Sequence, residues 1–414
     1  MDLTKEKPEL LAPAGDTGAM EAAYRNGADA VYIGAGEYNL RTRAGNLLVQ
    51  DVPAAVAAAD SWNRRVYLTL NTMPDDVQMR GVKETLEGIK FEGSLPDALI
   101  VSDPGVVRLC RRILPEVPLH LSTQTGTFNA EAMEFWREAG VARVILPREL
   151  TADEIRKYSR SGITETEIFV HGAMCMSISG RCLMSAWMNK RHPNTGGCSH
   201  PCRFRYRIIP LEGGRDELQE CGFDVSESEK GVYIMNSKDL NTLPVLPDLI
   251  KTGVDSLKIE GRNKSIHYVS SVVRIYREAI DKAYTDPEWY RVSEEWEREL
   301  EGIEHREYTT GFYFGERELQ STESSKQAGR VRVVGMVKEV TQDDEMIVDV
   351  KNPFYKGEAL SVMPSGFKRK TFMASFDEIL SFSGEVLEKA LTNRIVRVKS
   401  EHRLCRGDMI RRFD

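Results

Sequence analysis

Eight short apolar segments alternate with helix-like segments over the first 260 residues, and this alternation limits the possible folds more than any other feature. The apolar segments lie at residues 9–12, 30–34, 66–71, 98–102, 119–123, 143–147, 167–171 and 256–260. Short buried strands that alternate with helices indicate parallel βαβ units. Eight such units are typical of a closed barrel, so we expect an α/β fold with a TIM-like (β/α)8 barrel.

The intervening segments carry the signals of helix ends. Residues 16–27 begin with Asp16, a residue that caps helices, and stop at Gly27, which favours a helix end. Residues 130–140 repeat this design, with apolar side chains at helical spacing. The pattern therefore predicts a helix between successive strands.

One connection is much longer than the others. More than eighty residues separate the seventh apolar segment from the eighth, and we assign residues 172–253 to an insertion between strands seven and eight. Five of the seven cysteines lie in it. Because the βα loops of such barrels build the active site at the C-terminal face, the insertion marks the expected position of the chemistry.

The hydrophobic pattern of the sequence changes near residue 330. Apolar and polar residues alternate at 331–334, 346–350, 359–362 and 394–398, which predicts strands separated by turns. We expect a barrel domain over residues 1–325, containing the insertion, and a small all-β domain, a barrel or sandwich, over residues 330–414.

Composition narrows the class of protein. The formal net charge of −7 disfavours a protein built mainly to coat nucleic acid, although it allows a local basic patch. There is no apolar run long enough to cross a membrane and no apolar leader at the N-terminus, so we expect a cytoplasmic protein without a membrane partner. Disulfides rarely persist in that compartment, so the cysteines are better interpreted as ligands, catalysts or buried apolar residues.

Four cysteines define the candidate metal site. Cys175, Cys182, Cys198 and Cys202 have the spacing C-x6-C-x15-C-x3-C. Thiolate is the soft ligand that both zinc and iron–sulfur clusters prefer. Neither close pair has the CxxC spacing common in zinc sites, and wide, uneven gaps favour a cluster. A zinc site, and thiols that are simply buried or free, stay open as alternatives. Cys221, in the same insertion, is a second candidate for the fourth ligand.

Polar residues follow several of the predicted strands. Arg41, Arg148 and Arg262 are candidates to hold a carboxylated small molecule, because guanidinium pairs with carboxylate in a two-point contact. Arg203 and Arg205 belong to a basic and aromatic stretch that suits phosphates and stacked bases, with a solvated strand edge as the equally weighted alternative.

Three further strand ends carry candidate catalytic residues, Gln124, His171 and Glu260. Polar groups at this face of a barrel are typical of site residues, although some cap helices instead. For His171 the alternatives are metal binding, proton transfer and a purely structural role at the strand end.

Several segments, in order along residues 8–325, resemble the collagenase-like peptidases, family number thirty-two among peptidases of unassigned type. The matching segments are ELLAPAG (9–15), AVYIG (30–34), EIFVHGAMC (167–175), SGRC (179–182), CSHPCR (198–203), NSKDL (236–240) and KIEGR (258–262). The C-terminal part is similar to a small β-domain that some members carry.

This resemblance implies a function that the family name does not. Some members are oxygen-independent hydroxylases with a 4Fe–4S cluster on four cysteines, and the matching positions here are Cys175, Cys182, Cys198 and Cys202. The length and the extra β-domain make the chain most similar to the branch that forms 5-hydroxyuridine at the tRNA wobble position and depends on prephenate. The expected partners are therefore tRNA and prephenate, with a second protein or a second copy of the chain as a further partner.

Two other functions remain as alternatives. The first is a peptidase, for which Cys175 and His171 would be nucleophile and base; the sequence has neither an HExxH nor a GxSxG motif. The second is a noncatalytic, cluster-carrying RNA-binding protein. That hypothesis gains if the arginines and His171 do not converge on one pocket.

Overall fold

The N-terminal part of the computed structural model is a closed barrel of eight parallel strands. The structure describes residues 6–41, 45–206, 235–315, 319–321, 329–341 and 345–413. The barrel strands follow one another in chain order, and the last one closes the barrel by pairing with both the first and the seventh. They are β1 (Glu9–Pro13), β2 (Ala30–Gly34), β3 (Arg65–Leu70), β4 (Ala98–Val101), β5 (Leu119–Leu121), β6 (Val141–Ile145), β7 (Glu165–Ala173) and β9 (Ser256–Ile259). The predicted TIM-like barrel is confirmed.

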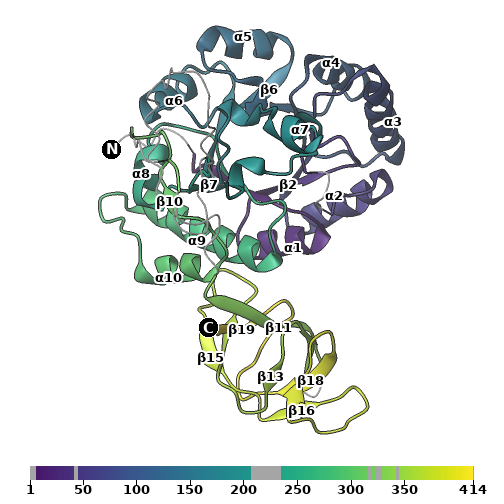
Figure 1. The fold of residues 1–414 in the computed structure, drawn as a ribbon, viewed down its shortest axis with the longest axis vertical. Helices are drawn as coiled ribbons and strands as arrows, with labels where there is room; N and C mark the ends of the chain where they lie inside the picture. Colours follow the sequence, from purple (N-terminus) through teal and green to yellow (C-terminus); the bar gives the residue numbers. More distant parts are fainter. Residues whose placement is uncertain are drawn as a thin grey trace, which may run out of the picture.

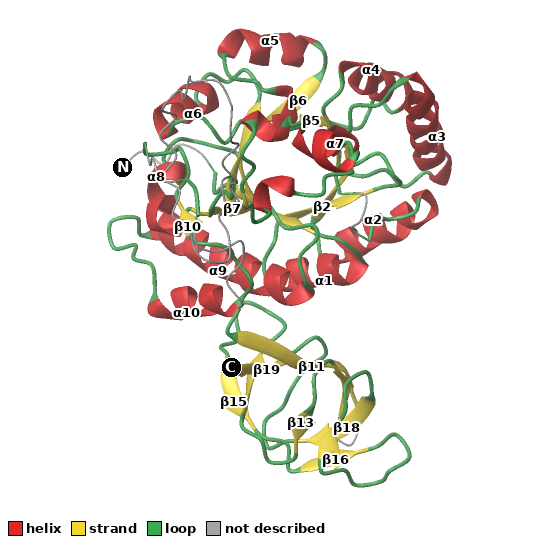
Figure 2. Ribbon diagram, in the orientation of Figure 1, coloured by secondary structure: helices red, strands yellow, loops and turns green. Residues whose placement is uncertain are grey.

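Helices surround these strands, as Figures 1 and 2 show. The outer ring contains α1 (Thr17–Arg25), α2 (Val52–Ser61), α3 (Asp76–Glu92), α4 (Pro104–Ile113), α5 (Ala130–Glu138), α6 (Ala152–Ser159), α8 (Leu246–Ile250) and α9 (Ile266–Thr285). The predicted capping residues explain where α1 begins and ends. The Asp16 side chain accepts a 2.7 Å hydrogen bond from the Ala19 N–H at the start of α1, and Gly27, with φ of +100°, follows the end of that helix.

The long connection between β7 and β9 differs from the single insertion that we predicted. It contains a strand, β8 (Asp239–Asn241), which pairs antiparallel with the end of β7 outside the closed barrel. β10 (Tyr308–Thr309) adds to β8. α8 then occupies the usual place of a helix before the last barrel strand, so only the part before β8 departs from the barrel pattern. Three residues are too few to show a strand period in the sequence, which is why β8 was missed.

The cysteine-bearing part of this connection lies over the barrel opening. Its one α-helix among the described residues, α7 (Met184–Asn189), lies inside the ring of outer helices in Figure 1. Gly172, near the end of β7, allows the chain to enter this segment while its backbone passes close to Glu260. Its φ is +103°, and a Cβ at this position would lie only 2.3 Å from the carbonyl oxygen of Glu260. A side chain here would force β7 away from the end of β9.

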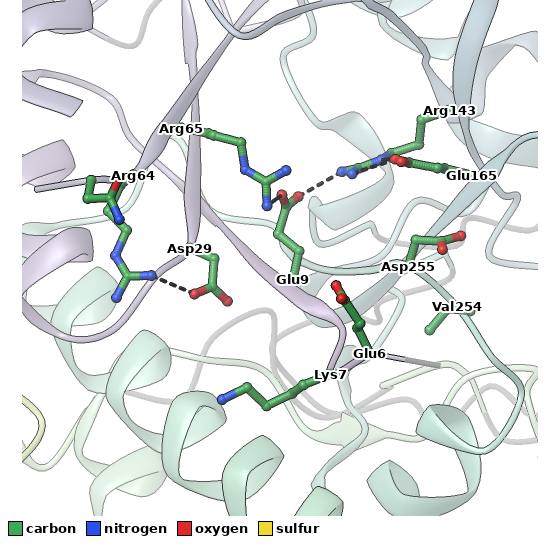
Figure 3. Close-up of a pocket in the computed structure, with 11 residues that line it drawn as sticks. Glu6, Lys7, Glu9, Asp29, Arg64, Arg65, Arg143, Glu165, Val254 and Asp255 are labelled. Atoms are coloured by element: carbon green, nitrogen blue, oxygen red, sulfur yellow. Dashed lines mark hydrogen bonds and ion pairs between the residues drawn. The ribbon is translucent and has the colours of Figure 1, made fainter. Parts of the chain in front are cut away.

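The opposite, N-terminal end of the barrel is filled by charged groups rather than by the usual apolar layers. Glu9 lies between Arg65, at 2.6 Å, and Arg143, at 2.7 Å (Figure 3). Arg143 also contacts Glu167, whose other oxygen binds the Lys258 ammonium at 2.8 Å. Because buried charges are costly unless paired, this network satisfies each charge with a partner from another strand. Polar residues at this end of a barrel favour a role in stability.

The C-terminal part is a separate antiparallel β-structure with its own core. One sheet has the order β15-β14-β19-β11-β12-β18-β16, and β13 pairs with β17. These strands are β11 (Val331–Val340), β12 (Met346–Val350), β13 (Phe354–Tyr355), β14 (Leu360–Met363), β15 (Phe372–Ala374), β16 (Glu378–Leu380), β17 (Lys389–Ala390), β18 (Ile395–Lys399) and β19 (Met409–Phe413). The predicted all-β character is confirmed.

The two parts meet beside α9 and α10 (Glu294–Gly302), as Figure 2 shows. Arg411 on β19 is fully buried and forms an ion pair with Glu299 on α10. The Arg274 guanidinium on α9 donates to the carbonyl oxygen of Pro364 at 3.4 Å. The β-domain is therefore attached to the outer helices of the barrel, away from the strands themselves.

No helix among the described residues combines the length and the apolar character needed to pass through a lipid bilayer.

Candidate active site at the barrel mouth

A cavity of about 370 Å³ lies at the C-terminal ends of the barrel strands, beneath the cysteine-bearing segment. Tyr32, Asn71, Gln124, Phe169 and Glu260 line it from five different strands or the loops that follow them. The segment after β7 supplies another part of the wall, including all four cysteines of the predicted ligand set. The cavity therefore lies where barrel enzymes place their chemistry.

Three contacts hold the cysteine-bearing segment on the barrel. The Glu149 carboxylate, after β6, accepts hydrogen bonds from the Ser179 N–H at 2.6 Å and from its hydroxyl at 3.1 Å. The Arg181 guanidinium donates to the carbonyl oxygen of Gln124 at 2.5 Å. The carbonyl oxygen of Asn194 accepts from the Met73 N–H at 3.1 Å. Loops after three different strands thus fix the segment over the cavity.

The four cysteines are free thiols, and each has at least part of its surface accessible. Backbone N–H groups point at two of the sulfurs, from Met184 to Cys182 Sγ and from His200 to Cys198 Sγ, both at 3.4 Å. Ser179 and His200 have positive φ angles of 46° and 55°. Such conformations are unfavourable for residues with a side chain and occur most often at functional sites. Here they bend the segment so that its thiols face the cavity.

Cys202 is influenced by two of the other thiols and by a neighbouring cation. Burial raises the pKa of Cys202, as do Cys175 and Cys198, whereas Arg203 acts in the opposite direction. His200, also in the cavity wall, has its pKa lowered to about 4 by burial and by the neighbouring arginines. The imidazole is therefore neutral at pH 7, and its Nδ1 lies 3.8 Å from Cys198 Sγ.

The chemistry of these donors fits an iron–sulfur cluster. Among the described residues there is no group of three or more His, Cys, Asp or Glu side chains that converges on a point suited to one metal ion. A 4Fe–4S cluster makes no such demand, because each thiolate binds a different iron. Four free thiols in the wall of one cavity are the type of donor that such a cluster uses. The fifth candidate, Cys221, lies outside the described residues.

The predicted arginines of the strand ends all line the cavity, but their surroundings differ. Arg41 forms a 3.1 Å ion pair with Glu260. Burial by itself would raise the pKa of Glu260, yet Arg41 and then Arg148 hold it below its usual value. Arg262 is buried and donates to Asn39 and Thr69 at 3.0 and 3.1 Å. Burial lowers the pKa of Arg262 to about 10.

Arg148 and Arg203 remain available to a ligand. The Arg148 guanidinium lies over the Phe169 ring, 3.8 Å from its centroid. Neither arginine forms an ion pair with any residue that the structure describes, although both line the cavity. A cation that is stacked on a ring but has no carboxylate partner is preorganised to accept one from a small molecule.

Two predicted site residues lie elsewhere. Arg205 is exposed and is not part of the cavity wall. His171 is 1% exposed and packs among Tyr268, Tyr276 and Tyr308, outside the cavity. Burial lowers the pKa of His171 to about 3, which keeps the ring neutral. The pairing of β7 with β9 shifts register between Phe169 and His171, so these two side chains do not share a face.

The other two predicted catalytic residues do line the cavity. Glu260 faces Arg41, as described above, and its second oxygen accepts from the Tyr32 hydroxyl at 3.3 Å. The Gln124 amide oxygen accepts a 2.5 Å hydrogen bond from the Ser122 hydroxyl. The arginines thus converge on one pocket whereas His171 does not, and the Cys175–His171 pair imagined for a peptidase is not assembled there.

The residues that line the cavity but were not predicted include three with functional side chains, Tyr32, His200 and Lys258. Lys258 is 4% exposed, and its ammonium lies 4.2 Å from the centroid of the Tyr32 ring. The sequence did contain a signal for Lys258, because it lies inside an apolar strand and lysines are rarely buried without a partner. His200 lay between two predicted ligands and carried no comparable signal.

Comparisons with known proteins agree with this architecture. Residues 15–323 match the model of "Peptidase family U32", and residues 330–411 match "Peptidase family U32 C-terminal domain". The chain is 35% identical to "tRNA hydroxylation protein P1" of Bacillus subtilis, over 98% of this chain and 95% of that protein. It is 36% identical to "tRNA hydroxylation protein P" of Escherichia coli, over 87% of each. It is also 31% identical to "Collagenase" of Porphyromonas gingivalis, over 75% of this chain and 74% of that protein. The chain therefore belongs to peptidase family U32.

Proposed function

We propose that this protein hydroxylates a uridine of tRNA, forming 5-hydroxyuridine at the wobble position without molecular oxygen and using prephenate as co-substrate. The observation that carries the proposal is the cavity at the barrel mouth. Its wall combines four free cysteine thiols with guanidinium groups that form no ion pair with any described residue. Relatives named as tRNA hydroxylation proteins cover nearly the whole chain, which supports the same activity here.

The four thiols would hold a 4Fe–4S cluster. Converting a C–H bond to C–OH removes two electrons and adds an oxygen atom, and amino-acid side chains do not catalyse such oxidations by themselves. A cluster supplies the electron-transfer chemistry. Cys175, Cys182, Cys198 and Cys202 are the proposed ligands, and the N–H groups of Met184 and His200 would stabilise the charge on two of the sulfurs.

The cavity has room for a small co-substrate and part of a nucleotide. Its volume of about 370 Å³ lies within the range of about 300–1,000 Å³ that small-molecule sites occupy. Prephenate carries two carboxylates, and Arg148 and Arg203 are the cations we assign to them. Chemistry on a base requires that the base leave its stack and enter the pocket. Phe169 and Tyr32 supply aromatic surface in the cavity wall.

Glu260 and Arg41 would position these groups. The ion pair leaves Glu260 charged, so at pH 7 it accepts hydrogen bonds rather than donating them. An acceptor of this kind suits the N3–H of a uracil ring. Gln124, fixed by Ser122, offers a second polar contact in the wall.

A peptidase remains the second candidate, because one relative is named a collagenase. The structure offers no support for the Cys175–His171 pair, since His171 is enclosed by tyrosines. We therefore rank hydrolysis below hydroxylation.

The decisive test starts from protein purified without oxygen. We expect about four irons and four sulfides per chain, and formation of 5-hydroxyuridine when the protein is given prephenate and tRNA that lacks the modification. Cys175→Ser should lose the iron and the activity together. One zinc and no sulfide, or no hydroxylated nucleoside from cluster-loaded protein, would contradict the proposal.

Arg148 provides a sharper test of the co-substrate site. Because Arg148→Met removes an unpaired guanidinium without disturbing an ion pair, we expect the KM for prephenate to rise at least about tenfold, with unchanged iron content. Arg137→Met, on the outer face of α5, is the control and should behave as the wild type. An unchanged KM for prephenate in Arg148→Met would refute the assignment of this residue.

A further inference from the structure

The cysteine-bearing segment has an unusual charge. Residues 172–206 contain five arginines and lysines and no aspartate or glutamate, although the whole chain has a net charge of −7. The cations are Arg181, Lys190, Arg191, Arg203 and Arg205. Arg203 faces the cavity, whereas Lys190 and Arg205 are exposed. Lys190 and Arg191 form no ion pair with any described residue. Among the residues that the structure describes, this segment therefore forms a local basic patch beside the cavity.

The same segment also exposes large apolar side chains. Trp187 on α7 is 78% exposed, and five others in residues 176–204 are between 44% and 65% exposed: Met176, Ile178, Leu183, Met188 and Phe204. Single exposed apolar residues are normal on protein surfaces, but a group of them in one segment marks a surface that binds something. We refer to Leu183, Trp187, Met188 and Phe204, with the cations Lys190 and Arg191, as the α7 platform.

The platform is held in place from beneath. Ser185, on the buried face of α7, exchanges 2.9 Å hydrogen bonds with the hydroxyl and the N–H of Ser199. The Tyr206 hydroxyl donates to the carbonyl oxygen of Pro201 at 2.7 Å and lies 3.5 Å from Met188 Sδ. α7 and the segment that carries Phe204 are thus tied together. Trp187 is exposed because its helix is fixed by the opposite face.

We propose that the α7 platform binds the single-stranded loop of the RNA substrate, with Trp187 stacked on a base next to the one that enters the cavity. Lys190 and Arg191 contact the backbone phosphates. This inference rests on the proposed function, because it places the RNA around the same cavity. Exposed aromatic rings flanked by cations are the usual means of binding single-stranded nucleic acid.

The positive charge of the α7 platform favours RNA over a protein as its binding partner. Protein–protein interfaces are depleted of lysine at their centres, and they need acidic residues on the partner to match an all-cationic patch. RNA offers a phosphate at every nucleotide. The four thiols and Met184 of α7 line the cavity, so the platform belongs to the same segment as the cavity wall. A loop held on the platform would therefore have its neighbouring base near the cavity.

The test measures the affinity of the cluster-loaded, full-length protein for unmodified tRNA by fluorescence anisotropy. Trp187→Ala should weaken binding about 5- to 150-fold, because a stacked base is lost, and Trp187→Phe should restore most of it. Trp289→Ala is the matched control. Trp289 is 75% exposed but lies between α9 and α10, outside the platform, so the tRNA affinity of that variant should equal that of the wild type.

The salt dependence tests the cations. If Lys190 and Arg191 each neutralise a phosphate, the double variant Lys190→Ala/Arg191→Ala should reduce the slope of log K against log salt by about 1.4, or about 0.7 for each contact with a single strand. Iron content and the visible spectrum should stay at wild-type values in all these variants, which separates a lost RNA contact from a lost cluster.

The possible outcomes separate this inference from the proposed function. Wild-type hydroxylation together with unchanged tRNA affinity in Trp187→Ala would overturn the platform and leave the function standing. Weakened tRNA binding in Trp187→Ala, from a wild type that forms no 5-hydroxyuridine, would support the platform and overturn the function. A Trp187→Ala variant that loses self-association but keeps its tRNA affinity would show a protein-binding surface and refute RNA as the occupant.

Discussion

His171 shows how a single residue can look functional in the sequence and yet lie outside the cavity. It lies near the end of β7, four positions before a predicted cysteine ligand, yet its ring is enclosed by tyrosines of α9 and β10. Its pKa falls from 6.5 to about 3 through burial. Between these two pH values the unfolded chain binds a proton that the folded protein does not. Burial of His171 therefore costs no stability above pH 6.5, and its cost grows as the pH falls from 6.5 toward 3.

This sign gives a prediction for acid unfolding. Near pH 5, His171→Phe should reduce the slope of unfolding free energy against pH by about 1.4 kcal/mol per pH unit, the value for one proton. The measurement is urea unfolding at several pH values between 4.5 and 7. Tyr276→Phe is the control. It removes the 2.7 Å hydrogen bond to the Val170 carbonyl, so it should lower stability by a similar amount at every pH. An unchanged slope in His171→Phe would show that burial does not set the pKa of His171.

Glu260 and Arg41 illustrate the opposite case at the residue scale. Both were predicted from strand-end positions, and the structure places them in contact at 3.1 Å. Strand ends of a barrel meet at one face whatever the intervening sequence, so side chains from β9 and the loop after β2 come together. The positions of strand ends in the sequence do not reveal which side chains pair with one another. Only the structure therefore showed that Arg148 can still bind a ligand, whereas Arg262 already donates hydrogen bonds to Asn39 and Thr69.

At the scale of elements, the segment after β7 depends on a few anchors to the barrel loops. Glu149 holds Ser179 by two hydrogen bonds, and this is the turn between Cys175 and Cys182. Contacts of this kind position the ligands of a metal centre without touching the metal. If the four cysteines hold a cluster, the anchor should control how long the cluster survives.

We expect Glu149→Ala to release iron at least about tenfold faster than the wild type in the presence of a chelator. The decay of the visible absorption measures this rate. Glu154→Ala is a suitable control, because Glu154 caps the neighbouring helix α6 at Thr151 and is not among the contacts of the cysteine-bearing segment. Equal rates of iron release in Glu149→Ala and the wild type would remove Glu149 from the support of the site.

At the scale of the whole molecule, one buried ion pair joins two separate cores. Arg411 of the β-domain is fully buried, and Glu299 of α10 is largely so. Burial raises the pKa of Glu299, but the nearby Arg411 outweighs that effect and keeps the pKa below its usual value. Removing one member of such a pair leaves the other charge buried and unpaired, which is more costly than losing an exposed pair.

Arg411→Met should therefore destabilise the attachment of the β-domain by about 3–5 kcal/mol. Calorimetry should show two thermal transitions for this variant, whereas we expect one for the wild type. Arg412→Met, on the same strand, removes a partly exposed pair with Glu358 within the β-domain, so we expect a loss of only about 0–1 kcal/mol and a single transition. A single, unshifted transition in Arg411→Met would mean that other contacts hold the domains together.

The amino-acid sequence by itself determined the kind of fold and the place of the candidate site. The eight apolar segments, the helix caps and the period-two strands are local patterns. They depend only on residues that are close together in the sequence, so they can be recognised without a structure. The C-x6-C-x15-C-x3-C spacing is equally local, so the thiols were found without a structure. Tertiary structure decided what depends on contacts between distant residues: the antiparallel β8, the enclosure of His171, and the placement of Lys258 and His200 in the cavity wall. It also decided which face of α7 is exposed, because that depends on how Ser185 packs against Ser199 rather than on the order of residues in the helix.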